Sequence, residues 1–149
     1  MRFVPLACPA WGPKHRDHAM TSPVLIDRFD HMVLTVANID ETGDFYRRVL
    51  GMEKAVFAGG RVALGFGCQK INLHPAENPY TPRAKNAVTG AGDLCLITET
   101  PLDDVITHLQ AEGVEIIEGP VAKTGAMGPI TSVYFRDPDE NLIEVSNYN

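Results

Sequence analysis

The chain of 149 residues is 44% hydrophobic and 21% charged, which suits one globular domain with its own core and leaves no room for two full domains. Its formal net charge of −6 argues against nucleic acid as a partner. No apolar run approaches the roughly 18 to 20 residues of a spanning helix, so we expect a soluble protein without a membrane partner.

The N-terminal segment differs from the remainder in its proline content and in its lack of a hydrophobic period. Residues 1–25 contain Pro5, Pro9, Pro13 and Pro23 and show no sustained period, so we expect them to be disordered or loosely packed ahead of a single domain over residues 26–149. A signal peptide is disfavoured, because the apolar part is short and broken by proline. The chain's three cysteines are widely spaced and form no C-x-x-C pair, which predicts a reducing cytoplasmic location rather than disulfides or a zinc knuckle.

The first folded module is predicted over residues 30–74. "HMVLTV" (31–36) alternates like a half-buried strand, and "NIDETGDFYRRVLGM" (38–52) has helical spacing with Asn38 as the cap and Gly51 as the stop. Three further strands are predicted in "EKAVF", "RVALGFG" and "KINLH". These elements form one β-α-β-β-β unit.

The second module, predicted over residues 93–147, repeats this order. A strand in "DLCLIT" (93–98) precedes a helix in "TPLDDVITHLQAEG" (100–113), with Thr100 as the expected cap, and strands follow in "VEIIE", "ITSVYF" and "NLIEVS". Gly51 and Gly113 each fall 20 positions after the first strand residue of their module. A repeat of this kind predicts two similar units joined by residues 75–92.

Strand alternation predicts which side chains share the sheet face that each helix leaves bare. Polar residues on those faces are His31, Asn72, Asp93 and Glu144, and we expect the two faces to meet around a cleft where these side chains converge. Glu144 stands out because it lies within the apolar run "LIEV", and a buried charge needs a partner.

Two segments, "DHMVLTVANIDETGDFYRRVLGM" and "FRDPDENLIEVSNY", resemble the vicinal oxygen chelate superfamily, which includes glyoxalase I, bleomycin- and fosfomycin-resistance proteins and extradiol dioxygenases. Within it, "QKINLH", "LCLITETPL" and "EGPVAKTGAMGP" are similar to glyoxalase domain-containing proteins and related bacterial virulence proteins. This resemblance implies an α+β fold in which two βαβββ modules pair into a cleft, and dimers are common in the superfamily.

The resemblance also implies a divalent metal ion (Mn, Fe, Ni, Co or Zn) that holds a small substrate through two adjacent oxygens. Its ligand positions fall on His31, Asp93 and Glu144, with Glu144 also the catalytic carboxylate. The fourth-strand position falls on Asn72, where glyoxalase I has a glutamate, and His74 is an alternative there. Asp93 stands where a histidine is usual, and a turn role for it is the other interpretation.

Three candidate functions are compatible with these residues. The leading one is a glyoxalase-like lyase or isomerase acting on a small vicinal-oxygen compound or thiol adduct, and the others are a non-catalytic binding protein of the bleomycin-resistance type and an extradiol-type dioxygenase. Substrate contacts are predicted from Arg83 and Lys85 in the linker and from Lys123 in a movable lid over residues 118–129. Solvated charge is the other interpretation of these cations. Cys95 is expected to be a small core side chain rather than a nucleophile.

Overall fold

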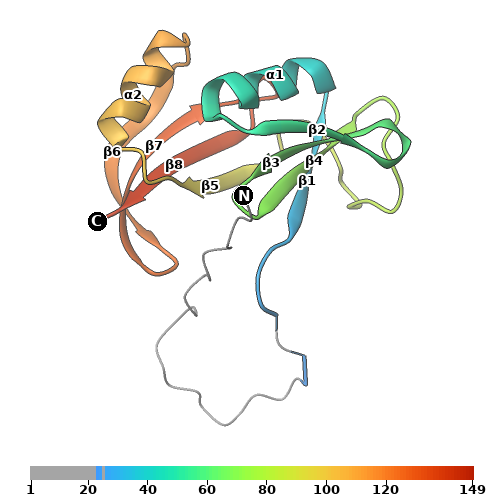
Figure 1. Cartoon of the computed structure of the whole chain (residues 1–149), viewed down its shortest axis with the longest axis horizontal. Helices are drawn as coiled ribbons and strands as arrows, with labels where there is room; N and C mark the ends of the chain where they lie inside the picture. Colours follow the sequence, from blue (N-terminus) through green and yellow to red (C-terminus); the bar gives the residue numbers. More distant parts are fainter. Residues whose placement is uncertain (1–22, 25) are drawn as a thin grey trace, which may run out of the picture.

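The computed structural model describes residues 23–24 and 26–149, so most of the proposed N-terminal segment lies outside the described residues. The described part contains two four-stranded sheets, each with one α-helix, as the sequence predicts (Figure 1). In that part no helix is long and apolar enough to cross a membrane.

The first module runs from β1 (His31–Val36) through α1 (Ile39–Leu50) to β2 (Glu53–Phe57), β3 (Arg61–Phe66) and β4 (Gln69–Pro75), with a short 3-10 turn at Ala58–Gly60. Its strand order is β1-β4-β3-β2, and β1 pairs with β4 in parallel. The expected cap is confirmed, because the Asn38 side chain accepts a hydrogen bond from the backbone N–H of Glu41 at 3.0 Å. Gly51 ends α1 in the left-handed conformation.

The second module repeats this topology with β5 (Asp93–Ile97), α2 (Leu102–Ala111), β6 (Ile116–Gly125), β7 (Gly128–Arg136) and β8 (Leu142–Tyr148) in the order β5-β8-β7-β6. The expected cap of α2 is wrong: Pro101 occupies that position without a side-chain bond. The Thr100 N–H instead donates to the hydroxyl of Thr98 at 3.1 Å, which turns the chain before the helix.

Residues 118–129, expected as a movable lid, belong to a β-hairpin formed by β6 and β7. Gly119 allows β6 to continue through its two register shifts: its φ is +115°, and a Cβ there would lie 2.5 Å from the carbonyl oxygen of Ser132. Gly119 and Gly125 therefore serve close strand packing, whereas Gly128 has open space around its Cβ position and a positive φ of +149°.

A single hydrophobic core joins the two modules on their helix-covered sides. It contains residues from both sheets at the parity opposite to His31 and Glu144, namely Leu34, Val36, Leu64, Ile71, Leu73, Val133, Phe135, Ile143 and Val145, and from α1 and α2. Figure 1 shows both helices on the same side of the sheets. The opposite faces carry no helix, so they are bare as the sequence predicts.

Buried hydrogen bonds link α1 to the turn between β7 and β8. The Tyr46 hydroxyl, fully buried, donates to Oδ2 of Asp137 at 2.8 Å, and the Asn141 side chain donates to the same oxygen at 2.8 Å. Asp139 accepts from the Ala37 backbone N–H at 3.0 Å. The bonds made by Tyr46 and Ala37 connect residues 91 and 102 positions apart in sequence and tie the first module to the second through the acidic turn.

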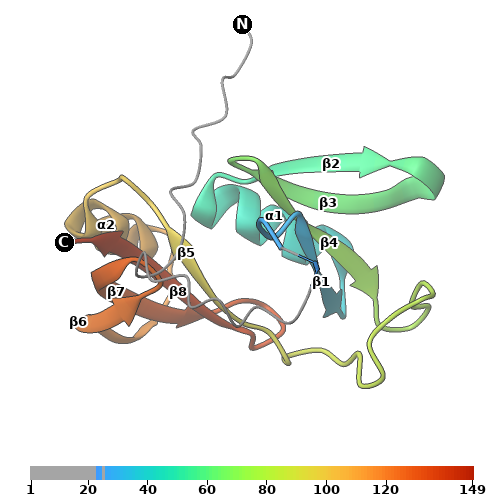
Figure 2. The same ribbon diagram turned by 90° about the horizontal axis from the view of Figure 1, so that it is seen from below.

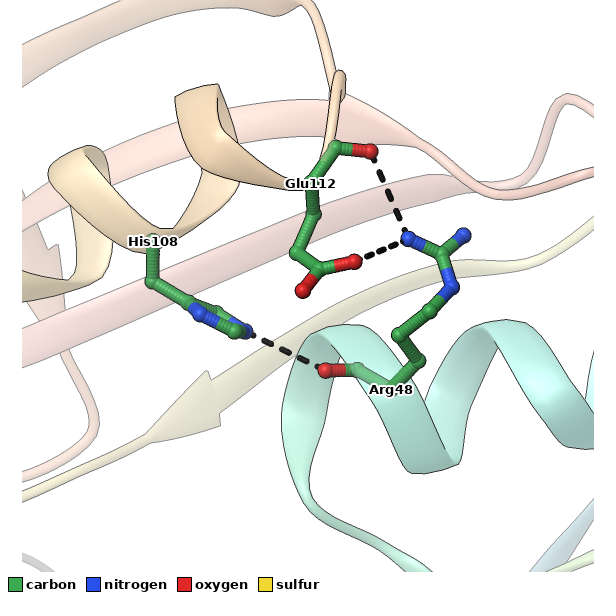
Figure 3. Close-up of polar contacts among 3 residues, drawn as sticks. All are labelled: Arg48, His108 and Glu112. Carbon is green, nitrogen blue, oxygen red and sulfur yellow. Dashed lines mark hydrogen bonds and ion pairs between the residues drawn. The ribbon is translucent and has the colours of Figure 1, made fainter.

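A second polar contact joins the ends of the two helices (Figure 3). The Arg48 guanidinium at the end of α1 donates to the Glu112 backbone carbonyl at 3.3 Å and forms an ion pair with the Glu112 carboxylate. His108 Nε2 lies 3.2 Å from the Arg48 carbonyl oxygen, so that nitrogen is the donor. Because Arg48 and Glu112 keep part of their surface in water, this contact adds less than the buried Tyr46 bond.

Candidate functional site

His31 begins β1 on the bare face, and its ring is oriented by the preceding residue. Its Nδ1 lies 2.7 Å from a carboxylate oxygen of Asp30. A carboxylate only accepts, so Nδ1 carries the hydrogen, and the same bond lowers the pKa of Asp30. In the neutral ring the other nitrogen, Nε2, holds a lone pair. A histidine oriented by a carboxylate in this way suits metal ligation.

Asn72 lies on the same bare face, one strand inward from the edge. The β1–β4 register pairs Val33 with Asn72 and Thr35 with His74, which confirms the predicted parity. The side-chain oxygen Oδ1 of Asn72 is buried and has no hydrogen-bond donor among the described residues. Such an orphaned acceptor is costly unless another group satisfies it.

The register also separates the two candidates for the fourth-strand position. His31 pairs with Lys70, so His74 lies four residues, or roughly 13 Å, farther along the strands, whereas Asn72 lies only roughly 7 Å along. His74 instead packs its ring edge-on against Tyr80, with ring centroids 5.0 Å apart. Burial, and secondarily the charge of Arg61, lowers the pKa of His74. Asn72 is therefore the closer neighbour of His31.

Glu144 sits in a polar cluster on the bare face of the second sheet. Ser132 donates to its Oε1 at 2.6 Å, and Ser146 donates to the same oxygen at 3.4 Å. Tyr134, its cross-strand partner, is a further neighbour: burial, followed by the hydrogen bond with Glu144, raises the pKa of Tyr134 to about 12. Hydroxyl donors on one carboxylate oxygen fix the orientation of the group, which suits a metal or substrate ligand.

Cys95 lies beside Glu144 on β5 and its thiol is 3.4 Å from the Ser146 hydroxyl. The expectation of a core side chain is wrong, because the residue is exposed on the bare face. Burial of the sulfur by its neighbours nevertheless raises the pKa of Cys95, which keeps the thiol protonated at neutral pH. The group is therefore a polar neighbour of Glu144 and a poor nucleophile.

Asp93 opens β5 and is exposed, with no ion pair to any other residue that the structure describes. Its backbone position is fixed by Gly92, whose N–H donates to Oδ1 of Asn141 at 2.7 Å. A Cβ on Gly92 would lie 2.8 Å from both that oxygen and a methyl group of Leu34. The close approach of β1, the acidic turn and the start of β5 thus requires glycine before Asp93.

The three predicted substrate cations fall in two different places. Lys123 lies on β6, with Nζ 3.6 Å from a Glu118 oxygen and 5.3 Å from the centre of the Tyr134 ring, which puts it near the Glu144 cluster. Arg83 and Lys85 are exposed on the linker and form no ion pair with a carboxylate in the described ranges.

Within this chain the candidate ligands form two half-sets rather than one cluster. Among residues 23–24 and 26–149, no three His, Cys, Asp or Glu side chains come close enough together to hold a metal ion. His31 and Asn72 belong to the first bare face, and Asp93 and Glu144 to the second. Apolar side chains on these faces are open to solvent: Val33 is 43% exposed and Ile97 is 50% exposed. Figure 2, seen from below, shows the two sheets spread side by side.

Four functional neighbours were not predicted from the sequence: Asp30, Ser132, Tyr134 and Ser146. The sequence signal for Asp30 was the adjacent acid–histidine pair "DH". The other three share the parity of Glu144 on β7 and β8, but recognising them requires the register that pairs Ser132 with Ser146 and Tyr134 with Glu144.

Two βαβββ modules with candidate ligands on their bare faces define a glyoxalase-type fold. Residues 28–145 match the model of the Glyoxalase/Bleomycin resistance protein/Dioxygenase superfamily, and the chain belongs to this family.

Individual relatives place it more closely. The virulence protein STM3117 of Salmonella typhimurium strain LT2 is 50% identical over 131 residues, which is 88% of this chain and 91% of that protein. The crystal structure of STM3117 superposes with a TM-score of 0.83 and covers 85% of this chain and 100% of that one. The integron cassette protein VCH_CASS1 from the mobile metagenome of V. cholerae also has a TM-score of 0.83, with 56% identity and coverage of 85% and 98%.

A more distant relative, the metallothiol transferase FosB of Shouchella clausii, is 30% identical over 129 residues, covering 81% of this chain and 80% of that protein.

Proposed function

We propose that this protein is a metal-dependent, glyoxalase-like lyase or isomerase whose site is assembled between two copies of the chain. The observation that carries the proposal is the state of the first half-set: His31 is oriented by Asp30 with a nitrogen lone pair left over, and the Asn72 oxygen beside it lacks a donor. Both features suit a cation at this point. The printed name of FosB, a metallothiol transferase, supports a metal and a thiol-bearing substrate.

The ligands would be His31 from one half-set and Asp93 and Glu144 from the other, with Asn72 turned toward the same ion. One nitrogen and two carboxylates form a hard ligand set, which favours Mn or Fe(II) over Zn more than a two-histidine set does. A bound ion would polarise two adjacent substrate oxygens as a Lewis acid. A second copy would be needed because the half-sets of one chain do not cluster in the part that the structure describes.

Pairing of two copies would bring the half-sets together. Exposed apolar residues on the bare faces, Val33 and Ile97, gain from being covered, and an interface with twofold symmetry would join the first face of one copy to the second face of the other. Such a pairing creates two equivalent sites. It also encloses the Lys123 and Tyr134 side chains beside Glu144, where Lys123 can meet an anionic substrate.

In this proposal Glu144 is the base that removes the proton. Removal of a proton next to a carbonyl needs a carboxylate in reach of the substrate, and Asn72 cannot act as a base. Ser132 and Ser146 both bind Oε1, so they fix the orientation of the carboxylate. The other oxygen, Oε2, is the one that would face the substrate.

A second candidate is a non-catalytic protein that sequesters a small molecule between two copies. The hydroxyl donors around Glu144 favour it, because Ser132 and Ser146 already bind one oxygen of the carboxylate that would have to act as the base. An extradiol-type dioxygenase is disfavoured, because its iron site usually takes two histidines and Asp93 stands at the second position.

Calorimetric titration of the metal-free protein with Mn, Fe(II), Co, Ni and Zn tests the proposal. We expect micromolar or tighter binding by the wild type and loss of binding in His31→Ala and Glu144→Gln. His108→Ala is the matched control, since that histidine lies on α2 away from the bare faces. Absence of binding by every ion would refute the metal site, and binding without turnover of small aldehyde–thiol adducts would favour the second candidate.

A further inference from the structure

A cavity of about 330 Å³ lies between the linker and the outer edge of the first sheet. Its walls come from β1, from linker residues between Pro82 and Ala91, and from the start of β5. The volume is at the low end of the roughly 300 to 1,000 Å³ typical of small-molecule sites. We refer to it as the linker cavity. Its lining contains neither His31 nor Glu144, and Asp93 is the one residue that it shares with the proposed metal ligands.

One polar side chain of the linker cavity is almost fully buried and has no partner. His74 is 8% exposed, and its ring makes no hydrogen bond to any residue in the described part of the chain. Its one neighbour of note is the Tyr80 ring, which it meets edge-on. A neutral imidazole carries one donor and one acceptor nitrogen, so a ligand in the cavity would find a ring without a hydrogen-bond partner among the described residues.

One arginine lines the cavity and a second lies behind His74, and neither has an acidic partner among the described residues. Arg83, three positions after Tyr80, lines the cavity, and Arg61 lies with its guanidinium 4.5 Å from the centre of the Tyr80 ring. Neither forms an ion pair with a carboxylate among residues 23–24 and 26–149. In a chain of net charge −6, two unpaired guanidinium groups near one buried histidine are a local positive region.

The remaining wall is mostly apolar. Val33, Leu34, Ala84, Ala87 and Val88 contribute small aliphatic side chains. An inorganic anion gains no binding energy from such a surface, whereas a short hydrocarbon group gains energy when the surface covers it. Asp93 is the one acidic residue in the lining, at the far end of the linker, and it disfavours a second negative charge on the ligand.

We propose that the linker cavity binds a small monocarboxylate with a short apolar body, held through its carboxylate by Arg83 and His74. Arg83 supplies a planar pair of donors that matches a carboxylate, and His74 supplies a single N–H. The alanine and valine side chains contact the hydrocarbon part. Asp93 is also one of the proposed metal ligands, so a molecule bound in the linker cavity would lie next to the proposed metal site.

Propionate is the probe, titrated into the full-length, metal-free protein in the presence of a chelator and followed by heteronuclear NMR of residues 82–93. We expect saturable shifts with propionate and at least about tenfold weaker binding to Arg83→Gln. Lys85→Gln is the matched control, because Lys85 is an exposed linker cation outside the cavity lining. Asp93→Asn should bind propionate more tightly, because a repulsive charge is removed.

Three results would overturn the proposal: propionamide binding as well as propionate, inorganic phosphate binding better than propionate, or equal loss in Arg83→Gln and Lys85→Gln. Arg83 is exposed, so its replacement should leave the fold intact. Propionate binding must also persist in His31→Ala. Failure of the metal titration with propionate binding retained would refute the proposed function alone, and the reverse pattern would refute the linker cavity alone.

Discussion

Replacing Tyr46 by phenylalanine tests whether the acidic turn between β7 and β8 holds the two modules together. The substitution removes only the hydroxyl, which is fully buried and donates to Asp137 at 2.8 Å. Asp137 is 4% exposed and keeps hydrogen-bond donors from Asn141 and from two backbone N–H groups. The substitution therefore removes one of several donors to this buried carboxylate. Burial, then Asp137, raises the pKa of Tyr46, so the phenol stays a donor throughout the accessible pH range.

A hydrogen bond to a buried charged group contributes about 1.5 to 3 kcal/mol, so we expect Tyr46→Phe to lower the free energy of unfolding by about 2 kcal/mol. For a chain of this length that corresponds to a Tm lower by roughly 4 to 8 °C. Urea unfolding monitored by circular dichroism gives the first value and calorimetry the second. Tyr148→Phe is the control, since Tyr148 is 38% exposed and accepts one long bond from Met127. Equal effects of the two substitutions would refute the reasoning.

Three further predictions concern the core and the ionisable groups. Phe45→Asp or Ile106→Asp should each destabilise the whole domain by roughly 3 kcal/mol or more in one transition, because both residues pack against the single core; separate melting of two halves would contradict this. Ultraviolet titration should show Tyr134 ionising at about 12, and Glu144→Gln should lower that pKa; a transition near 10 in the wild type would contradict the cluster. The pKa of His74 is lowered by burial, so its contribution to stability is present above about 6.5 and is lost as pH falls through the folded pKa. His74→Gln should therefore flatten the loss of stability in acid, and an unchanged acid profile would be inconsistent with a buried neutral ring.

Local elements followed from the sequence because their signals are local. The Asn38 cap, the Gly51 stop and the alternation in β1 act within a few residues, and the equal spacing of the two modules predicted the repeat. The cap of α2 was mistaken because the helix begins one residue later, after Pro101, and Thr100 belongs to the turn that its N–H forms with the Thr98 hydroxyl. The hairpin in "EGPVAKTGAMGP" was not predicted, because its glycines suit a loop as well as close strand packing and the pairing with β7 is not visible in the sequence pattern.

Site geometry was predictable only in part. Strand parity placed His31 and Glu144 on bare faces, but the partners of Glu144 depend on the register between β7 and β8. How the two bare faces lie relative to each other depends on which sides of the sheets pack into the shared core. Strand alternation does not determine this. The linker cavity depends on how an irregular segment lies over β1, for which Arg83 carried no periodic signal.

Subunit complementation tests most directly the central proposal that the metal site is assembled from two copies. His31→Ala and Glu144→Gln are each expected to lose metal binding, and the two variants would be unfolded together, refolded and titrated with Mn. If each site takes His31 from one copy and Glu144 from the other, random mixing restores one intact site in every mixed dimer, or about a quarter of the wild-type sites. If both ligands act within one chain, or if no dimer forms, the mixture will bind no more metal than either variant alone, and the account would be contradicted.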